Sequence, residues 1–126
     1  MGLVLFPGDG NTDSPDISWS YTGFGLFRKW LAQIEGFALD QMRGFGGDRP
    51  WSEVATTLAP LLDHPDDGGP DLTPAQCAAI SPRLSEIAGI QGDPLDPVWQ
   101  RRIQDVRQLV GVLQFCIERD TGLLFG

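Results

Sequence analysis

The densest group of metal-ligating side chains in this sequence is a run of carboxylates near its middle. Asp63, Asp66, Asp67 and Asp71 lie within nine residues that also contain two glycines and two prolines. Carboxylate oxygens at alternating loop positions, with a glycine at the sixth, are the pattern that binds Ca²⁺ in EF-hand loops. One hypothesis is therefore that residues 63–76 form a degenerate, EF-hand-like Ca²⁺-binding module that uses these four aspartates.

The register of this loop departs from the EF-hand pattern. With Gly68 at position 6, Asp63 and Asp67 occupy positions 1 and 5, but Pro65 stands at position 3 and Pro74 at position 12. The alternative interpretation is a turn that leads into the next helix and holds no metal. Ca²⁺ is the cofactor that this pattern suggests, but we expect the protein to need no cofactor.

Nucleophilic catalysis has little support in the sequence. The single histidine, His64, stands in a turn rich in proline and aspartate, and no Gly-x-Ser-x-Gly nucleophile elbow occurs. One histidine and two cysteines in dissimilar segments do not make an ordinary zinc site. We therefore expect a protein without catalytic activity, although 17 acidic residues leave open a small enzyme that uses a carboxylate pair.

Aromatic side chains are concentrated between residues 19 and 30. One interpretation is that a strand and a helix pack these rings against one another as part of the core. The other is a partly open aromatic face that meets a ligand or a protein partner. The candidate binding residues on this second interpretation are Trp19, Tyr21, Phe24 and Trp30.

Two cysteines, Cys77 and Cys116, each fall within a pattern typical of the apolar face of a helix. Buried free cysteines behave as small apolar residues, so we expect two reduced, buried thiols. A structural disulfide between them is the alternative.

Charge and hydropathy limit the classes of partner. Acidic residues outnumber lysine and arginine by 17 to 9, which gives a formal net charge of -8. Such a chain is poorly suited to bind nucleic acid or an anionic membrane. No apolar run approaches the length of about 18 residues that a membrane span needs, and the start of the sequence does not resemble a signal peptide. We expect a cytoplasmic protein.

The elements that position these residues follow from hydrophobic periodicity. Apolar residues at 3–6 and alternating residues at 17–21 predict two antiparallel strands, joined by an exposed loop over residues 7–16. A helix should run from residue 22 or 23 to Gly36, followed by a loop with at most one short turn or strand over residues 37–47. The next helix should begin near Pro50 and be kinked or ended by Pro60.

Two further helices have clear start signals. Thr73 with Gln76 predicts a capping box, and Pro82 then implies either one kinked helix or two short ones, the second capped by Ser81. Asp96 caps a last, long helix that runs to residues 121–122, and residues 123–126 should pack or pair with the N-terminal strands. The sequence predicts one α+β domain over residues 1–126, with about four helices and a small N-terminal antiparallel β element.

Three stretches resemble a set of small uncharacterised actinobacterial proteins: ISWSYTGF at residues 17–24, PLLDH at residues 60–64 and LTP at residues 72–74. Members of that set carry a tighter acidic loop, close to D-x-D-G-x-L-T-P-E-E. The loop here is longer by inserted glycine and proline, and Gln76 stands where that pattern has glutamate. The resemblance implies no activity.

The leading functional hypothesis is a small acidic protein that acts by binding an unidentified protein or small-molecule ligand. An antitoxin-type or immunity-type protein would fit, because an acidic face can mask a basic surface. The calcium module and the carboxylate-pair enzyme are the two alternatives.

Overall fold

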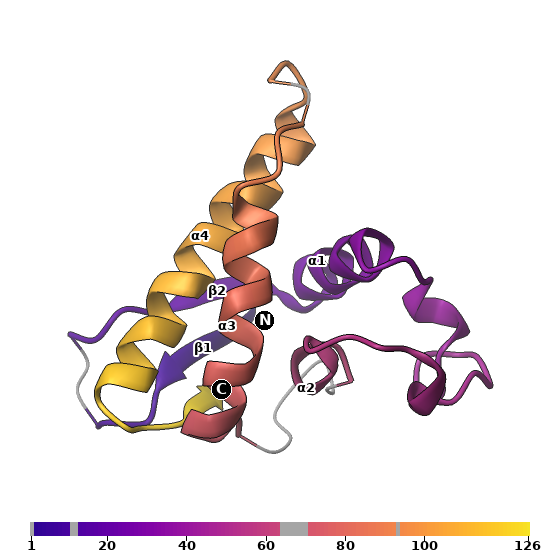
Figure 1. Cartoon of the computed structure of the whole chain (residues 1–126). Helices are drawn as coiled ribbons and strands as arrows, with labels where there is room; N and C mark the ends of the chain where they lie inside the picture. Colours follow the sequence, from indigo (N-terminus) through magenta and orange to yellow (C-terminus); the bar gives the residue numbers. More distant parts are fainter. Residues whose placement is uncertain (1, 11–12, 64–70, 93) are drawn as a thin grey trace.

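A computed structural model describes residues 2–10, 13–63, 71–92 and 94–126 (Figure 1). Helices dominate this part of the chain, and three short strands form one antiparallel sheet. The predicted α+β domain with a small N-terminal strand pair is confirmed. In chain order the elements are β1 (Gly2–Pro7), β2 (Ile17–Ser20), α1 (Tyr21–Ile34), the 3₁₀ helices η1 (Leu39–Gln41) and η2 (Trp51–Glu53), α2 (Ala59–Leu62), α3 (Pro74–Ala88), α4 (Pro97–Glu118) and β3 (Leu123–Phe125).

The sheet has β1 at its centre, with β2 on one side and β3 on the other. Leu5 pairs with Ile17 of β2 and with Phe125 of β3. The first and last strands of the described residues, β1 and β3, therefore lie side by side. Because successive strand residues point to opposite faces, Leu3 and Leu5 enter the core while Val4 and Phe6 lie on the outer face. The predicted pairing of the C-terminal tail with an N-terminal strand is confirmed.

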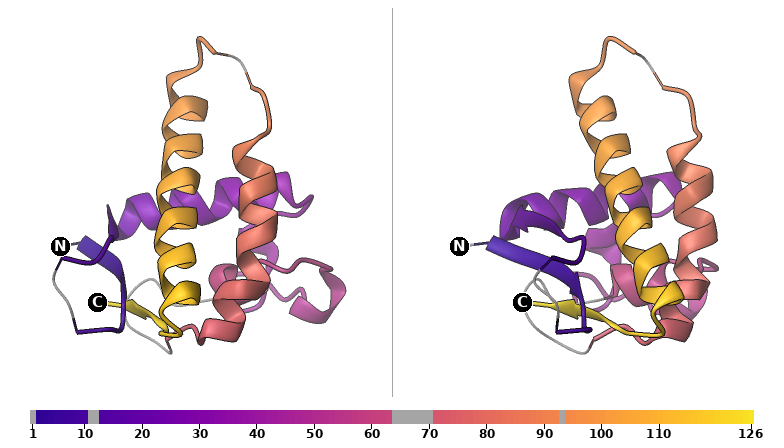
Figure 2. Two further views of the ribbon diagram at one scale, coloured as in Figure 1. Left: turned by 60° about the vertical axis from the view of Figure 1, so that its left-hand side comes forward. Right: turned by 90° about the vertical axis from the view of Figure 1, so that its left-hand side faces the viewer.

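Helices α3 and α4 form an antiparallel hairpin that crosses the inner face of the sheet and projects beyond it (Figures 1 and 2). Both starts match the sequence signals. The Oγ1 of Thr73 accepts a hydrogen bond from the Gln76 amide, and the Gln76 side chain accepts one from the Thr73 amide, which completes a capping box. An Asp96 side-chain oxygen accepts from the first amides of α4.

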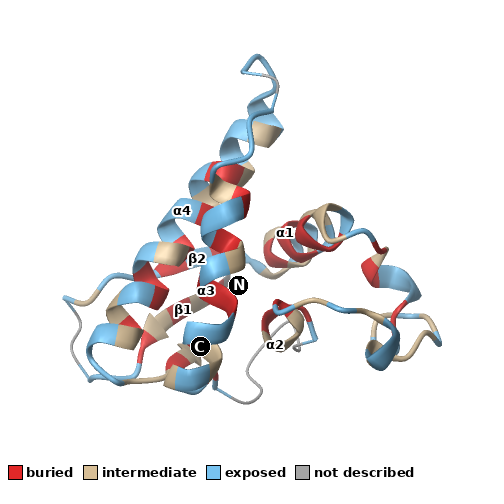
Figure 3. Ribbon diagram, viewed as in Figure 1, coloured by how far each residue is buried: buried red, intermediate tan, exposed pale blue. Residues whose placement is uncertain are grey.

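The buried residues form one core between the sheet, α1 and the hairpin (Figure 3). Helix α1 passes behind the hairpin, so its apolar stripe meets both the strands and α3–α4 (Figure 2). The short α2 lies beneath α1 and contributes Leu61 and Leu62 to the same core.

The predicted helix from Pro50 to about Ala59 is wrong. Residues 51–53 form a 3₁₀ turn, and α-helix begins only at Ala59. The Trp51 ring contacts Phe37 edge-on, and its indole N–H donates to the carbonyl oxygen of Arg43 at 3.0 Å, which draws the segment out of helical register. Pro60 starts α2 instead of ending a helix, since at the second helical position its missing N–H costs no bond.

Two boundaries also differ from expectation. Tyr21 belongs to α1 and not to the strand, because the Oγ of Ser20 accepts a hydrogen bond from the Gly23 amide at 2.9 Å and caps the helix there. Pro82 lies inside the single helix α3. Ser81, the expected cap of a second helix, is buried and accepts a hydrogen bond from Nε2 of Gln114 at 3.2 Å.

Candidate functional site

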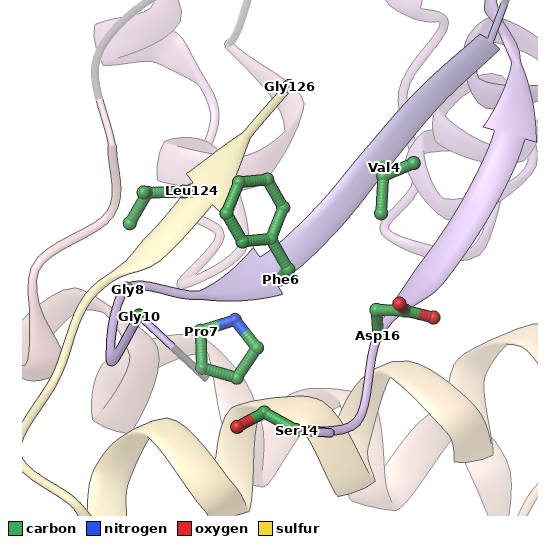
Figure 4. Close-up of a pocket in the computed structure, with 9 residues that line it drawn as sticks. All are labelled: Val4, Phe6, Pro7, Gly8, Gly10, Ser14, Asp16, Leu124 and Gly126. Atoms are coloured by element: carbon green, nitrogen blue, oxygen red, sulfur yellow. The ribbon is translucent and has the colours of Figure 1, made fainter. Parts of the chain in front are cut away.

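A hollow of about 700 Å³ lies on the outer face of the sheet, opposite the core (Figure 4). Its floor is formed by Val4 and Phe6 of β1 and by Leu124 of β3, and Figure 4 shows the Phe6 ring between the other two side chains. All three are partly exposed. The remaining lining residues come from the end of β1, from the loop between β1 and β2, and from residue 126: Pro7, Gly8, Gly10, Ser14, Asp16 and Gly126.

Tertiary hydrogen bonds hold this loop at the edge of the hollow. The amide of Gly8 donates to the carbonyl oxygen of Gly122 at 2.9 Å, which fixes the loop start beside β3. At the other end, Nε2 of Gln108 on α4 donates to the carbonyl oxygen of Asp16 at 2.9 Å. The walls of the hollow therefore depend on contacts between segments far apart in the sequence.

The polar groups at this hollow are acidic or neutral. Asp16 lines it directly, and Ser14 donates a hydrogen bond from Oγ to a carboxylate oxygen of Asp9 at 2.6 Å. Among the described residues that line the hollow, none is basic. An apolar floor with a carboxylate rim suits an apolar group attached to a cation, and it disfavours an anion.

The aromatic residues singled out in the sequence are brought together, mainly as core. Phe24 is fully buried, and Trp19 is only 9% exposed. The Trp19 ring stacks on Phe27 at 4.9 Å between centroids, and its indole N–H donates to Oδ2 of Asp105 at 3.2 Å. A buried tryptophan whose polar atom is satisfied stabilises the fold, and neither Phe24 nor Trp19 offers appreciable surface to a partner.

Tyr21 and Trp30 are partly exposed. Trp30 meets the ring of Trp99 edge-on at 5.3 Å, which joins α1 to the start of α4. Tyr21 lines a second, smaller hollow of about 330 Å³ together with Lys29 and Phe45. The four candidate aromatic residues therefore do not form one open face.

A buried arginine was missed by the sequence analysis. Arg28 is 1% exposed, and its guanidinium lies over the rings of Phe24 at 4.5 Å and Phe45 at 5.3 Å. Its Nη1 donates to the carbonyl oxygen of Leu62 at 3.5 Å, so the side chain fastens the end of α2 to α1. The spacing in the sequence could have predicted this burial. Arg28 and Leu31 follow Phe24 by four and seven residues, so all three lie on one face of the helix.

The acidic loop is described only at its ends. Asp63 and Asp71 are exposed, whereas Asp66 and Asp67 lie outside the described residues. Within the described ranges, no three histidine, cysteine, aspartate or glutamate side chains come together as metal ligands. The Ca²⁺ hypothesis for residues 63–76 stays a prediction.

One carboxylate takes part in a close side-chain network. Glu35 accepts hydrogen bonds from Nε of Arg83 at 3.0 and 3.1 Å and from the Thr56 hydroxyl at 3.0 Å. These contacts raise the pKa of the Arg83 guanidinium above its ordinary value, chiefly through the hydrogen bond with Glu35. A carboxylate held in this way joins the end of α1 to α3 and is poorly placed to move a proton.

The two cysteines are fully buried and free, as expected from the sequence. The Cys116 thiol donates a hydrogen bond to the carbonyl oxygen of Gly122 at 3.6 Å. Interaction between the two thiols lowers the pKa of Cys77 and, together with burial, raises the pKa of Cys116. The helical pattern predicted that each cysteine lies on the inner face of its helix, but only the packing of α3 on α4 brings the two thiols close enough to interact.

No protein-family model, curated protein or solved structure matches this chain. In the part of the chain that the structure describes, none of the helices combines the length and hydrophobicity that a bilayer crossing requires. The functional argument therefore proceeds from the geometry of the hollow and its charge.

Proposed function

We propose that this chain is a small cytoplasmic binding protein without catalytic activity, and that the hollow on the outer face of the sheet holds an apolar side chain from a basic protein segment. The observation that carries the proposal is the apolar floor left uncovered by the fold. Val4, Phe6 and Leu124 form this floor in a hollow of about 700 Å³, which is the size of an ordinary ligand-binding pocket.

Charge supports a cationic partner. Asp16 stands at the rim, the described lining contains no basic residue, and the whole chain carries a net charge of -8. An acidic protein attracts basic partners over long range, and a carboxylate beside an apolar pocket accepts a hydrogen bond from an ammonium or guanidinium group. An antitoxin-type or immunity-type role fits this chemistry.

The test uses two capped peptides of equal length, one alternating lysine with leucine and the other alternating glutamate with leucine. Amide chemical shifts of the protein are followed by NMR during titration. We expect the lysine peptide to shift the resonances of Val4, Phe6 and Leu124, and the glutamate peptide to leave them in place. Equal shifts with both peptides, or shifts confined to other surfaces, would contradict the proposal.

Variants separate the pocket from general charge attraction. Phe6→Ser removes most of the floor and should weaken the lysine peptide about tenfold, since burying part of an aromatic ring contributes roughly 1.4 kcal/mol. Asp16→Asn should weaken it less and reduce its salt dependence. Ser18→Ala is the matched control, because Ser18 is exposed on the neighbouring strand, opposite Val4, and does not line the hollow.

The Ca²⁺ module at residues 63–76 has an independent test. A ligand present at 100 times its Kd stabilises the folded state by about 2.7 kcal/mol, so calcium binding would raise the melting temperature clearly. A melting temperature that is unchanged by calcium in the millimolar range would end that hypothesis.

A further inference from the structure

The two cysteines lie at the same end of the helical hairpin. Cys77 lies in the first turns of α3 and Cys116 in the last turns of α4, and the two helices run antiparallel. Both side chains are fully buried, and the Cys116 thiol donates a hydrogen bond to the carbonyl oxygen of Gly122 at 3.6 Å, next to Leu123, whose backbone interacts with the Cys77 thiol. Both thiols therefore lie against the same short stretch of chain, residues 122–123, and interact with each other. Proximity of this kind is the first requirement for a disulfide.

The backbone around this pair is held from both sides. Leu72 and Leu123 exchange two hydrogen bonds, at 3.0 and 2.8 Å, just before α3 and just after α4. The amide of Thr121 donates to the carbonyl oxygen of Cys116 at 3.0 Å, which closes the end of α4. These bonds fix the two helix ends relative to each other, so the fold itself holds the two thiols near each other.

The environment makes the two thiols chemically unequal. Interaction with Cys116 lowers the pKa of Cys77, whereas interaction with Cys77 and burial raise the pKa of Cys116. The thiolate is the reactive form of a cysteine, so Cys77 is the nucleophile of the pair and Cys116 the resolving thiol.

We propose that Cys77 and Cys116 are an oxidative modification site that forms a reversible intramolecular disulfide, with hydrogen peroxide as the oxidant. The Cys77 thiolate attacks one peroxide oxygen, the O–O bond breaks, and the departing oxygen leaves as water after taking up a proton. The sulfur of Cys116 then attacks the Cys77 sulfenic acid, and the S–O bond breaks to give the second water. In total, two thiols and one peroxide give one disulfide and two waters.

Burial determines how this site responds. Neither sulfur is exposed, so the oxidant must reach Cys77 through transient opening of the corner that Leu72 and Leu123 close. The disulfide would close a loop of about 40 residues, and cross-links of that length restrict the unfolded chain strongly. Oxidation should therefore convert α3 and α4 into a more stable hairpin without changing the fold.

The experiment treats the folded full-length protein with hydrogen peroxide and then unfolds it for thiol titration and intact-mass measurement. We expect a monomer that has lost two hydrogens, has no titratable thiol, melts about 10 °C higher and returns to its starting state with dithiothreitol. Cys77→Ser and Cys116→Ser are the controls, and neither variant should lose two hydrogens.

Other outcomes would overturn the proposal. If the folded protein keeps two free thiols after peroxide treatment that oxidises the unfolded chain, the fold keeps the two sulfurs apart. Linked dimers would show that the cysteines react independently. A disulfide that lowers the melting temperature would show that the folded geometry does not accommodate the bond.

Discussion

Replacing Trp19 with phenylalanine tests whether the aromatic cluster is structural. The indole is 9% exposed, stacks on Phe27 at 4.9 Å and donates to Asp105 at 3.2 Å. Phenylalanine keeps one ring in the stack but removes the second ring and the donor. The smaller ring costs about 1 kcal/mol of burial, and the hydrogen bond to a carboxylate contributes about 2 kcal/mol.

We therefore expect Trp19→Phe to lower the free energy of unfolding by about 3 kcal/mol, which corresponds to a fall of roughly 10 °C in the melting temperature for a domain of this size. Urea unfolding followed by circular dichroism measures the change. A double-mutant cycle with Asp105→Ala isolates the hydrogen bond and should give a coupling energy of about 1 to 2 kcal/mol.

Arg101→Ala is the matched control for this cycle. Arg101 also approaches Asp105, but at 3.9 Å and with a side chain that is 74% exposed, so its removal should change stability by less than about 0.5 kcal/mol. If the free energy of unfolding of Trp19→Phe lies within about 0.5 kcal/mol of that of the unmodified protein, the indole does not contribute to the core. A folded Trp19→Phe protein that has lost a partner would instead support the aromatic binding face.

Four further substitutions have defined expectations. Gly111→Ala should stabilise the protein by about 0.5 to 1 kcal/mol in urea unfolding, because a Cβ at this position in α4 meets no neighbouring atom. Gly47→Ala should instead destabilise the protein, because the added Cβ would overlap the backbone of residue 41. Thr73→Ala removes half of the capping box and should cost about 1 kcal/mol, with the loss seen as a lower urea midpoint at an unchanged slope. Glu35→Gln should cost about 1 to 2 kcal/mol because it weakens the bonds with Arg83, whose side chain is 31% exposed. The folded-state pKa of Arg83 is raised, so the stabilisation from its charge is complete below the ordinary arginine pKa and is lost only at strongly alkaline pH. Even pH 9 is about three units below the ordinary arginine pKa. The loss of stability caused by Glu35→Gln should therefore not decrease between pH 6 and pH 9 through titration of Arg83.

Local signals in the sequence were sufficient for several elements. The capping box at Thr73, the cap at Asp96 and the apolar spacing of the last helix each depend on residues within one or two turns. Such interactions operate in almost any tertiary context. The pairing of the C-terminal tail with β1 followed from its apolar character alone.

The parts that the sequence could not predict depend on distant contacts. The segment that begins at Trp51 leaves helical register because its ring meets Phe37 and Phe45, which the local pattern does not contain. The hollow on the outer face needs a hydrogen bond between Gln108 and Asp16, which are 92 residues apart in the sequence. The apolar run at residues 3–6 predicted a strand, but it could not show that a loop would wall one face of that strand.

The sheet places a kinetic requirement on the chain, because its central strand, β1, is made long before its edge strand β3. The amide of Val4 donates to the carbonyl oxygen of Gly126 at 2.8 Å, and the reverse bond is 2.9 Å long. During synthesis, β1 therefore cannot pair with β3 until residues 123–125 have emerged, whereas the α3–α4 hairpin can assemble from segments that are neighbours in the sequence. The emerging chain exposes the apolar inner face of β1 throughout this interval, which is when the protein is most open to aggregation.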